Sequence, residues 1–264
     1  MCRHAAYLGP PRLLARDLLD APHSLHHQSF APRELLVGSV NADGFGVAWY
    51  APDIAPGAAL YRSTLPIWAD ASFASVARHT RSGVWVANVR NGTDPGTTAL
   101  TNTHPFADGP WSFSHNGFLG GFRTGAMRRL RAGLSDAQYA HIAGCTDSET
   151  LFRLVLTRIE AGSDAPRALG SVLGEASEVA EEQQTVAQLN VLLSDGSTVW
   201  ATRLANQPRT NSLYVCERDT ADGTERFVAS EPFDEGAGWQ AVEPGSLVRM
   251  DADGIVVTRF PASS

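Results

Sequence analysis

The sequence of 264 residues contains no lysine, and all 21 of its basic residues are arginine. A lysine is required by a Walker A phosphate loop, by a pyridoxal-phosphate enzyme or Schiff-base aldolase, and by a protein kinase. The sequence therefore excludes these classes of protein. The same absence leaves the α-amine at the N-terminus as the only aliphatic amine of the chain.

Cysteine is also scarce, and long apolar runs are absent. Cys2, Cys145 and Cys216 are far apart, and no Cys-x-x-Cys occurs. This pattern favours free thiols in a reducing compartment over a disulfide framework or a zinc site. No stretch reaches the roughly 18 apolar residues of a transmembrane helix, and the N-terminus lacks the apolar run of a signal peptide. We therefore expect a cytoplasmic protein without a membrane partner.

The charge balance is acidic, with 28 Asp and Glu residues and a formal net charge of −7. Surfaces that bind nucleic acid are usually basic, so we expect no nucleic-acid partner. The apolar fraction of 43% is ordinary for a globular protein. No linker rich in Pro, Gly or Ser divides the sequence, and we expect residues 1–264 to form a single domain.

The predicted elements follow the order strands, helices, strands. Strand patterns occupy residues 47–50, 84–89 and 111–114, and helical patterns lie between residues 124 and 182. Further strand patterns occupy residues 186–193, 198–203, 213–217, 226–229, 247–250 and 255–260. Three of the intervening turns carry Asp-Gly, at residues 195–196, 222–223 and 253–254. This arrangement predicts an α+β fold with antiparallel sheets.

Cys2 directly follows the initiator methionine. Methionine aminopeptidase removes Met1 when the next side chain is small, so we expect the mature chain to begin with Cys2. The thiol and the α-amine would then lie on one residue, and an amine with a pKa of about 8 can accept the thiol proton. This combination is typical of an N-terminal nucleophile, although a cysteine at position two is more often incidental.

Three further features are candidate partners for such a nucleophile. Asn116 and Gly117 follow a predicted strand and can present two N–H groups to an oxyanion, although Asn-Gly also favours a hairpin turn. Arg90 ends a predicted strand beside a Gly-rich loop, where it can bind a carboxylate or form a surface ion pair. Asp147 can bind an ammonium group or, like Thr146, cap the helix that follows.

Together these pieces resemble the class II glutamine amidotransferase-like hydrolases, which are N-terminal-nucleophile hydrolases. The order and spacing of the motifs match that family between residues 1 and 149, and further matches follow near the C-terminal end. The motifs are Met1-Cys2-Arg3-His4, Asn41-Ala42-Asp43-Gly44-Phe45-Gly46-Val47, Val89-Arg90 with Thr93 and Gly96, Asn102-Thr103-His104-Pro105-Phe106, Ser114-His115-Asn116-Gly117, Thr146-Asp147-Ser148-Glu149, and Val228-Ala229-Ser230-Glu231-Pro232 with Trp239.

The opening is also similar to the branch of this family that acts in ergothioneine biosynthesis. The matching pieces there are Cys2-Arg3-His4, Leu8-Gly9, Pro22-His23-Ser24-Leu25, Gln28-Ser29 and Pro32-Arg33.

The resemblance implies a four-layer αββα sandwich and hydrolysis of a γ-glutamyl amide. It implies Cys2 as the nucleophile, with its own α-amine as the base, and an oxyanion hole formed by Asn116 and Gly117. Arg90 would bind the α-carboxylate of the glutamyl group, and Asp147 its α-ammonium group. The expected partner is a small-molecule γ-glutamyl substrate with water as the acceptor, and neither a cofactor nor a metal is expected.

Thr93 would support the carboxylate, but the sequence departs from the family around it. Members of the family often carry Arg-Trp-Ala-Thr-His-Gly, whereas this chain has Arg90-Asn91-Gly92-Thr93-Asp94-Pro95-Gly96. The Trp and His are missing and one residue is added, which speaks against glutamine as the substrate. A cationic leaving group could stack on an aromatic side chain. The candidates are Trp49, Trp68 and Trp111.

Three other hypotheses stay open. One is an amidase of the same family that acts on another γ-glutamyl compound, such as a glutathione-like peptide or glutamine. Another is a binding protein without catalysis. The third is a metal-dependent hydrolase, which no His-Glu-x-x-His motif supports. Its candidate ligands are His23, His26, His27, His104 and His115.

Overall fold

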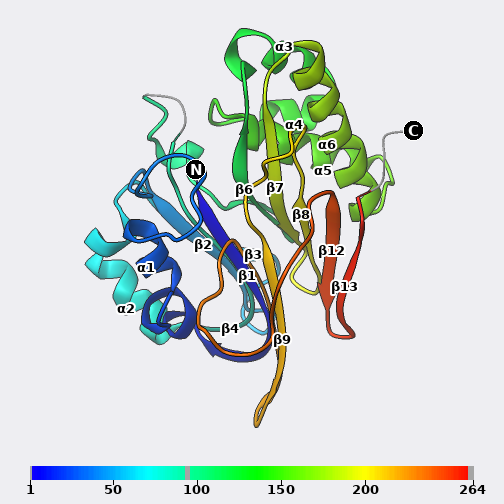
Figure 1. Cartoon of the computed structure of the whole chain (residues 1–264). Coiled ribbons are helices and arrows are strands. Elements are labelled where there is room, and N and C mark those ends of the chain that lie inside the picture. Colours follow the sequence, from blue (N-terminus) through cyan, green and yellow to red (C-terminus); the bar gives the residue numbers. More distant parts are fainter. Residues whose placement is uncertain (1, 93–95, 261–264) are drawn as a thin grey trace.

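Two antiparallel β-sheets form the centre of the protein, and helices cover the outer face of each (Figure 1). The computed structural model describes residues 2–92 and 96–260. All strand pairs within both sheets are antiparallel, as the sequence predicts.

The larger sheet has seven strands with β1 at its middle, where Ala5 pairs with Ala229 on one side and with Ala87 on the other. Its order is β11 (Trp239–Ala241), β9 (Tyr214–Thr220), β10 (Gly223–Ala229), β1 (Arg3–Leu13), β4 (Arg81–Val89), β2 (Phe45–Tyr50) and β3 (Ala58–Ser63).

The second sheet has six strands, and its longest pairing joins β6 to β7. Its order is β13 (Gly254–Arg259), β12 (Ser246–Asp251), β8 (Val199–Arg203), β7 (Ala187–Ser194), β6 (Trp111–Leu119) and β5 (Phe106–Asp108).

Helices α1 and α2 lie on the seven-stranded sheet, and α5 and α6 lie on the six-stranded sheet (Figure 1). The helices are α1 (Leu25–Phe30), α2 (Ala71–His79), α3 (Ala126–Arg131), α4 (Asp136–Ala140), α5 (Asp147–Glu160) and α6 (Ala165–Glu182), with a π-helical turn η1 (Arg16–Asp20). Short 3₁₀ turns are η2 (Ile67–Ala69), η3 (Leu100–Asn102) and η4 (Phe122–Thr124).

Three apolar clusters fill the spaces between the four layers. On β1, Tyr7 faces the helices and Leu8 faces the other sheet, because successive side chains of a strand point to opposite faces. Tyr7 packs in one cluster with Phe73 of α2. On the outer face of the six-stranded sheet, Phe113 of β6 stacks on Phe152 of α5, with 5.4 Å between the ring centroids. This confirms the expected α+β, four-layer αββα sandwich.

The turns and strands of the C-terminal half follow the predicted pattern closely. Asp-Gly pairs stand at the connections β7–β8, β9–β10 and β12–β13. The helical region between residues 124 and 182 contains four helices, α3 to α6. The N-terminal half holds more regular structure than its sequence pattern shows, above all β1.

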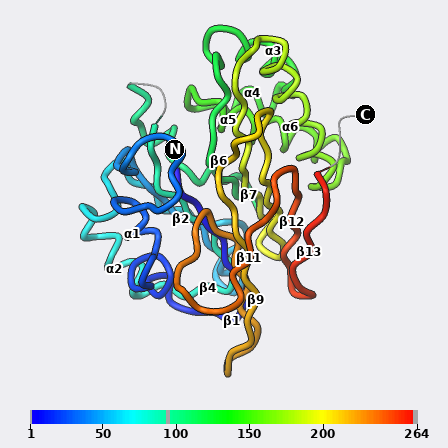
Figure 2. Tube along the Cα trace, viewed as in Figure 1, coloured from blue at the N-terminus to red at the C-terminus, as the bar shows by residue number. Residues whose placement is uncertain are grey.

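The start of β1 and the middle of β6 are distant in sequence but adjacent in space (Figure 2). His4 Nδ1 lies 3.3 Å from Ser114 Oγ, across the two sheets. This contact brings the N-terminal end of the chain to the same end of the sandwich as the last residues of β6.

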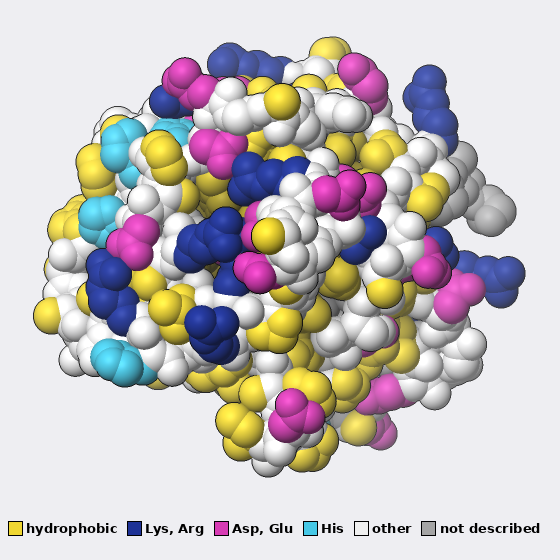
Figure 3. All heavy atoms as spheres, turned by 90° about the horizontal axis from the view of Figure 1, so that it is seen from below, with side chains coloured by type: hydrophobic (Ala, Val, Ile, Leu, Met, Phe, Trp, Pro, Cys, Tyr) yellow, Lys and Arg dark blue, Asp and Glu magenta, His cyan; other side chains and the backbone are white. Residues whose placement is uncertain are grey.

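Arginine and acidic side chains lie beside one another on the lower face of the molecule (Figure 3). The β9–β10 hairpin carries such pairs, including Arg226 Nε to Glu217 Oε2 at 2.6 Å. Within residues 2–92 and 96–260, no helix is long and apolar enough to cross a membrane.

Candidate active site

A cavity of about 760 Å³ opens where β1 begins, β4 and β6 end and α5 begins. Cys2, Arg90, Gly117 and Asp147 all line it. Cys2 and Arg90 lie beside the paired ends of β1 and β4 in one sheet, and stacking of the other sheet brings Gly117 of β6 to them. Asp147 joins them from the start of α5.

Cys2 is 6% exposed and immediately precedes β1. Its Sγ lies 3.8 Å from the backbone oxygen of Asn91, at the edge of the cavity. The guanidinium of Arg3 donates from Nε to the carbonyl oxygen of Cys2 at 2.7 Å. The hydrogen bond from Arg3 therefore fixes the backbone of Cys2, while the Cys2 side chain lines the cavity.

Arg3 is itself fixed by a buried carboxylate. Glu231, 1% exposed, accepts from Arg3 Nη1 at 3.1 Å and from His23 Nε2 at 2.6 Å. It also accepts from the backbone N–H groups of Arg33 and Glu34, at 2.9 and 3.0 Å. Burial alone would raise the pKa of Glu231, but these hydrogen bonds and the charge of Arg3 hold it below the usual value. The ion pair of Arg3 and Glu231 thus fixes the guanidinium that holds the backbone of Cys2.

Arg90 is 4% exposed, so the alternative of a surface ion pair is wrong. Its Nη2 donates to Thr97 Oγ1 at 2.9 Å and its Nη1 to the carbonyl oxygen of Asp43 at 3.4 Å. In the described part of the chain, no carboxylate lies within ion-pair distance of it. A buried guanidinium with only neutral partners, beside a cavity, suits a carboxylate ligand.

Asp147 is the first residue of α5. Thr146 is the N-cap of this helix, and its side-chain oxygen accepts from the N–H of Glu149 at 3.2 Å. Asp147 Oδ2 accepts from the N–H of Leu119 at 2.6 Å, and Oδ1 accepts from the N–H of Ser148 at 2.6 Å. Among the residues described, no arginine or histidine pairs with it. This carboxylate is fixed in direction and available to a cation in the cavity.

Asn116 and Gly117 lie within β6, paired with Asn190 and Leu189 of β7, so the hairpin-turn alternative is wrong. Asn116 is fully buried, and its Nδ2 donates to Ser230 Oγ at 3.2 Å. Gly117 lines the cavity, whereas Asn116 lies behind that surface. An added Cβ at residue 117 would lie 1.8 Å from the backbone oxygen of Gln188. Only glycine therefore fits between β6 and β7 at this point.

Thr93 lies outside the described residues. The hydroxyl that meets Arg90 belongs to Thr97, which sequence reasoning missed. Thr97 lies one position beyond Gly96 of the predicted carboxylate loop, and a hydroxyl so near that loop was the available signal.

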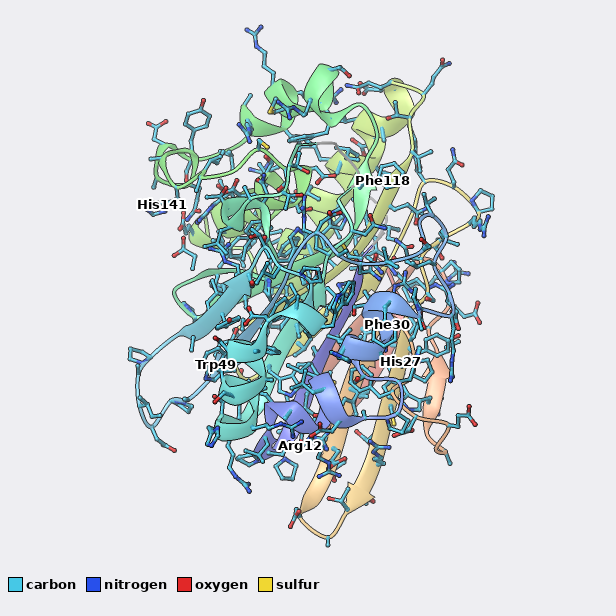
Figure 4. All side chains as sticks on the ribbon, turned by 90° about the vertical axis from the view of Figure 1, so that its left-hand side faces the viewer. Arg12, His27, Phe30, Trp49, Phe118 and His141 are labelled. Atoms are coloured by element: carbon cyan, nitrogen blue, oxygen red, sulfur yellow. The ribbon has the colours of Figure 1, made fainter. Side chains whose placement is uncertain are left out.

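The three predicted stacking tryptophans do not line the cavity. Trp49 packs against the core beneath α2, and Trp111 packs against Trp200 in the other core. Trp68 stands edge-on to Phe30 of α1 at 6.1 Å. The aromatic residues that line the cavity are Phe118 and Phe122. Figure 4 shows Phe118 at the end of β6, well above Trp49.

The five histidines considered as metal ligands lie in two separate groups. His23, His26 and His27 lie on or just before α1, whereas His104 and His115 line the cavity. No group of three or more His, Cys, Asp or Glu side chains in the described ranges is arranged to hold a metal ion.

His4 and His104 are buried, and neither has a carboxylate partner within residues 2–92 and 96–260. Burial lowers the pKa of each well below the usual 6.5, and Coulombic interactions lower it further, with Arg3 for His4 and with His115 and Arg90 for His104. The N–H of His115 donates to Nδ1 of His104 at 3.2 Å, so a neutral His104 carries its proton on Nε2.

Acidification below pH 6.5 is expected to destabilise the fold through these histidines. The unfolded chain takes up their protons near pH 6.5, whereas the folded state, with lowered pKa values, does not. The contribution is full above pH 6.5 and falls by at most about 1.4 kcal/mol for each histidine at pH 5.5. Urea denaturation at pH 7.5 and 5.5 measures it. The loss of stability should be smaller in His4→Asn than in the wild type. It should persist in the control His79→Asn, where the replaced ring is exposed. An equal loss in the wild type and both variants would contradict the assignment.

A family model described as class II glutamine amidotransferases matches residues 19–263. The chain belongs to the class II glutamine amidotransferase family. It is 36% identical to the γ-glutamyl-hercynylcysteine sulfoxide hydrolase of Mycolicibacterium smegmatis over 98% of this chain and 99% of that protein.

Solved structures show the same fold. A glutamine aminotransferase class-II domain protein from Silicibacter pomeroyi matches with a TM-score of 0.73 and 29% identity, covering 99% of this chain and 100% of that one. The glutamine phosphoribosylpyrophosphate amidotransferase of B. subtilis matches with a TM-score of 0.66 and 15% identity, over 99% of this chain and 50% of that one. This class II amidotransferase family member is thus an N-terminal-nucleophile-type hydrolase in fold and family.

Proposed function

We propose that the protein removes glutamate from γ-glutamyl-hercynylcysteine sulfoxide, a step of ergothioneine biosynthesis, with Cys2 as the nucleophile. The observation that carries this proposal is the single cavity shared by Cys2, Arg90, Gly117 and Asp147. The identity to a hydrolase with that substrate in its name, over nearly the whole of both chains, supports the choice of substrate.

Arg90 and Asp147 recognise the amino-acid head of the glutamyl group. The buried Arg90 guanidinium pairs with the α-carboxylate, and Asp147 pairs with the α-ammonium group. Thr97 orients Arg90 through its hydroxyl, and Thr93 supports the same carboxylate. The γ-amide carbon is then directed toward Cys2 on the same cavity wall.

Catalysis begins when the α-amine of Cys2, free after removal of Met1, takes the thiol proton. The thiolate attacks the γ-carbonyl carbon, and the amine returns that proton to the departing nitrogen as the C–N bond breaks. The γ-glutamyl thioester is left on Cys2. Water then attacks the thioester, giving glutamate and restoring the thiol.

The oxyanion of both tetrahedral intermediates is stabilised by Asn116 and the N–H of Gly117. The Nδ2 group of Asn116 has two hydrogens, so its bond to Ser230 leaves one for the substrate. The rigid β6–β7 pairing fixes both donors before the substrate arrives. Such preorganised donors are worth roughly 2.7–4 kcal/mol each in the transition state.

A panel of γ-glutamyl compounds with detection of released glutamate tests the proposal. The panel contains γ-glutamyl-hercynylcysteine sulfoxide, glutathione and glutamine at equal concentrations. We expect kcat/KM to be highest for the sulfoxide. A higher value for glutathione or glutamine would assign the enzyme to another γ-glutamyl compound, and no glutamate release from any of them would overturn the proposal.

Because the chain has no lysine, its α-amine is a single target for amine-selective reagents. We expect one equivalent of an N-hydroxysuccinimide acetyl ester to label Cys2 and abolish hydrolysis, since the labelled nitrogen no longer accepts a proton. Intact mass and peptide mapping report the site, after thioesters have been reversed with hydroxylamine. Full activity of the labelled protein, or of protein that retains Met1, would contradict the role of the amine.

A further inference from the structure

The cavity holds one cation more than the glutamyl head requires. Arg90 and Asp147 are assigned to the α-carboxylate and the α-ammonium group, which leaves Arg123 on the cavity wall. In the described residues, Arg123 forms no ion pair and donates no hydrogen bond to another side chain or backbone group. Its charge is therefore available to a ligand.

We propose that Arg123 binds a carboxylate on the leaving portion of the substrate, so that the enzyme selects γ-glutamyl amides of α-amino acids over glutamine. This inference rests on the proposed γ-glutamyl hydrolase function and assigns a residue to the other side of the scissile bond. In such a substrate the amide nitrogen is attached to a Cα that carries the carboxylate. The leaving portion of the proposed sulfoxide has this form, whereas glutamine releases only ammonia.

The backbone around Arg123 is built to hold the side chain at the cavity. Arg123 lies in the η4 turn, between buried Phe122 and exposed Thr124. Gly121 precedes the turn with φ of +68°, and its carbonyl accepts from the N–H of Gly125 at 2.9 Å. Phe122 is 6% exposed and packs in the core beneath the helices. With Phe122 anchored inward, the neighbouring Arg123 is exposed and contributes to the cavity lining.

The turn is also tied to the glutamyl site. The N–H of Leu119, four residues before Arg123, donates to Asp147 Oδ2 at 2.6 Å. The carboxylate assigned to the α-ammonium group thus fixes the end of the segment that carries Arg123. The link holds the end of β6, just before the η4 turn, next to Asp147.

Part of the remaining cavity wall is apolar, and the cavity is large. Phe118 lies two residues beyond Asn116, on the same face of β6, because side chains alternate along a strand. Phe122 and Val37 add apolar surface. The volume of about 760 Å³ lies in the range that holds drug-sized ligands and exceeds what a five-carbon acyl group fills. A large leaving portion that carries a carboxylate fits this part of the cavity.

The test uses two compounds that differ by one carboxylate, γ-glutamyl-alanine and γ-glutamyl-ethylamide. Each is measured with the full-length enzyme as a substrate or, if turnover is slow, as a competitive inhibitor of sulfoxide hydrolysis. We expect Arg123→Gln to raise KM or Ki for γ-glutamyl-alanine by about two- to fivefold, as for a partly exposed ion pair, with kcat nearly unchanged. The constant for γ-glutamyl-ethylamide should not change.

Arg128→Gln is the matched control, because Arg128 is exposed on the adjacent helix α3 and does not line the cavity. It should leave both constants as in the wild type. Equal wild-type affinity for the two compounds, or equal effects of Arg123→Gln on both, would overturn the inference. If instead the wild type releases no glutamate from any γ-glutamyl compound, the proposed function itself fails.

Discussion

Replacing Cys2 by alanine is expected to lower kcat/KM for γ-glutamyl hydrolysis by about ten-thousand-fold or more, as loss of a nucleophile does in other hydrolases. The variant lacks the atom that forms the thioester, while Arg90, Asp147 and Gly117 still line the cavity. The fold should survive, because the change removes one sulfur atom from a side chain at the cavity wall. Glutamate release in steady state, together with a far-UV circular dichroism spectrum, measures both expectations.

Cys145→Ala is the control for this substitution, because Cys145 lines the same cavity. Its Sγ accepts from Asn102 Nδ2 at 3.5 Å, and no step of the proposed mechanism uses it. The kcat/KM of Cys145→Ala should stay within about threefold of the wild-type value, because substitutions away from the reacting groups usually have small effects. The mechanism would fail if Cys2→Ala kept its activity, or if Cys145→Ala lost as much activity as Cys2→Ala.

Replacing Glu231 by alanine is expected to lower the free energy of unfolding by about 3–5 kcal/mol, because it leaves the charge of Arg3 buried without a partner. Arg3 is 0% exposed, and its other side-chain contacts are the neutral oxygens of Cys2 and Ser212. The substitution also removes the acceptor of the N–H groups of Arg33 and Glu34. Urea denaturation followed by tryptophan fluorescence measures the loss.

Glu235→Ala removes a carboxylate only four residues away and provides the control. Its side chain is 88% exposed and pairs with Arg33 at 3.7 Å, at the protein surface. Exposed pairs of this kind contribute about 0.2–1 kcal/mol. A similar loss of stability in both variants would contradict the special role of the buried pair. Activity should fall in Glu231→Ala even when the variant is folded, because Arg3 then no longer holds the backbone of Cys2 in one position.

The sequence motifs predicted most of the candidate site but not its geometry. Arg90 and Asp147 were each open to an ordinary structural explanation when taken alone. The structure removes those alternatives, because Arg90 is buried and Thr146 takes the role of helix cap. Asn-Gly is a strong turn signal in isolation. In β6 the Asn116-Gly117 pair is extended, because its pairing with β7 outweighs the local preference of Asn-Gly for a turn.

The missed elements have a common physical reason, which is that their contacts are distant in sequence. Strand β1 contains buried Arg3 and His4 followed by Gly9, Pro10 and Pro11, so its composition does not alternate as an exposed strand does. It becomes a central strand because β4 and β10 pair with it on both sides. The aromatic lining was missed likewise, since the sequence names Trp49, Trp68 and Trp111 as candidates but does not show where any of them packs.

The sequence by itself determined the α+β order, the Asp-Gly turns and the set of reactive groups, including the single aliphatic amine. Those features depend on local backbone preference and on residue chemistry, which neighbouring residues are sufficient to define. The tertiary structure alone decided that Cys2, Arg90, Gly117 and Asp147 meet in one cavity, and that Arg123 has no ion-pair or hydrogen-bond partner there among the residues that the structure describes. These relations depend on the stacking of two sheets, whose contacts join residues more than a hundred positions apart.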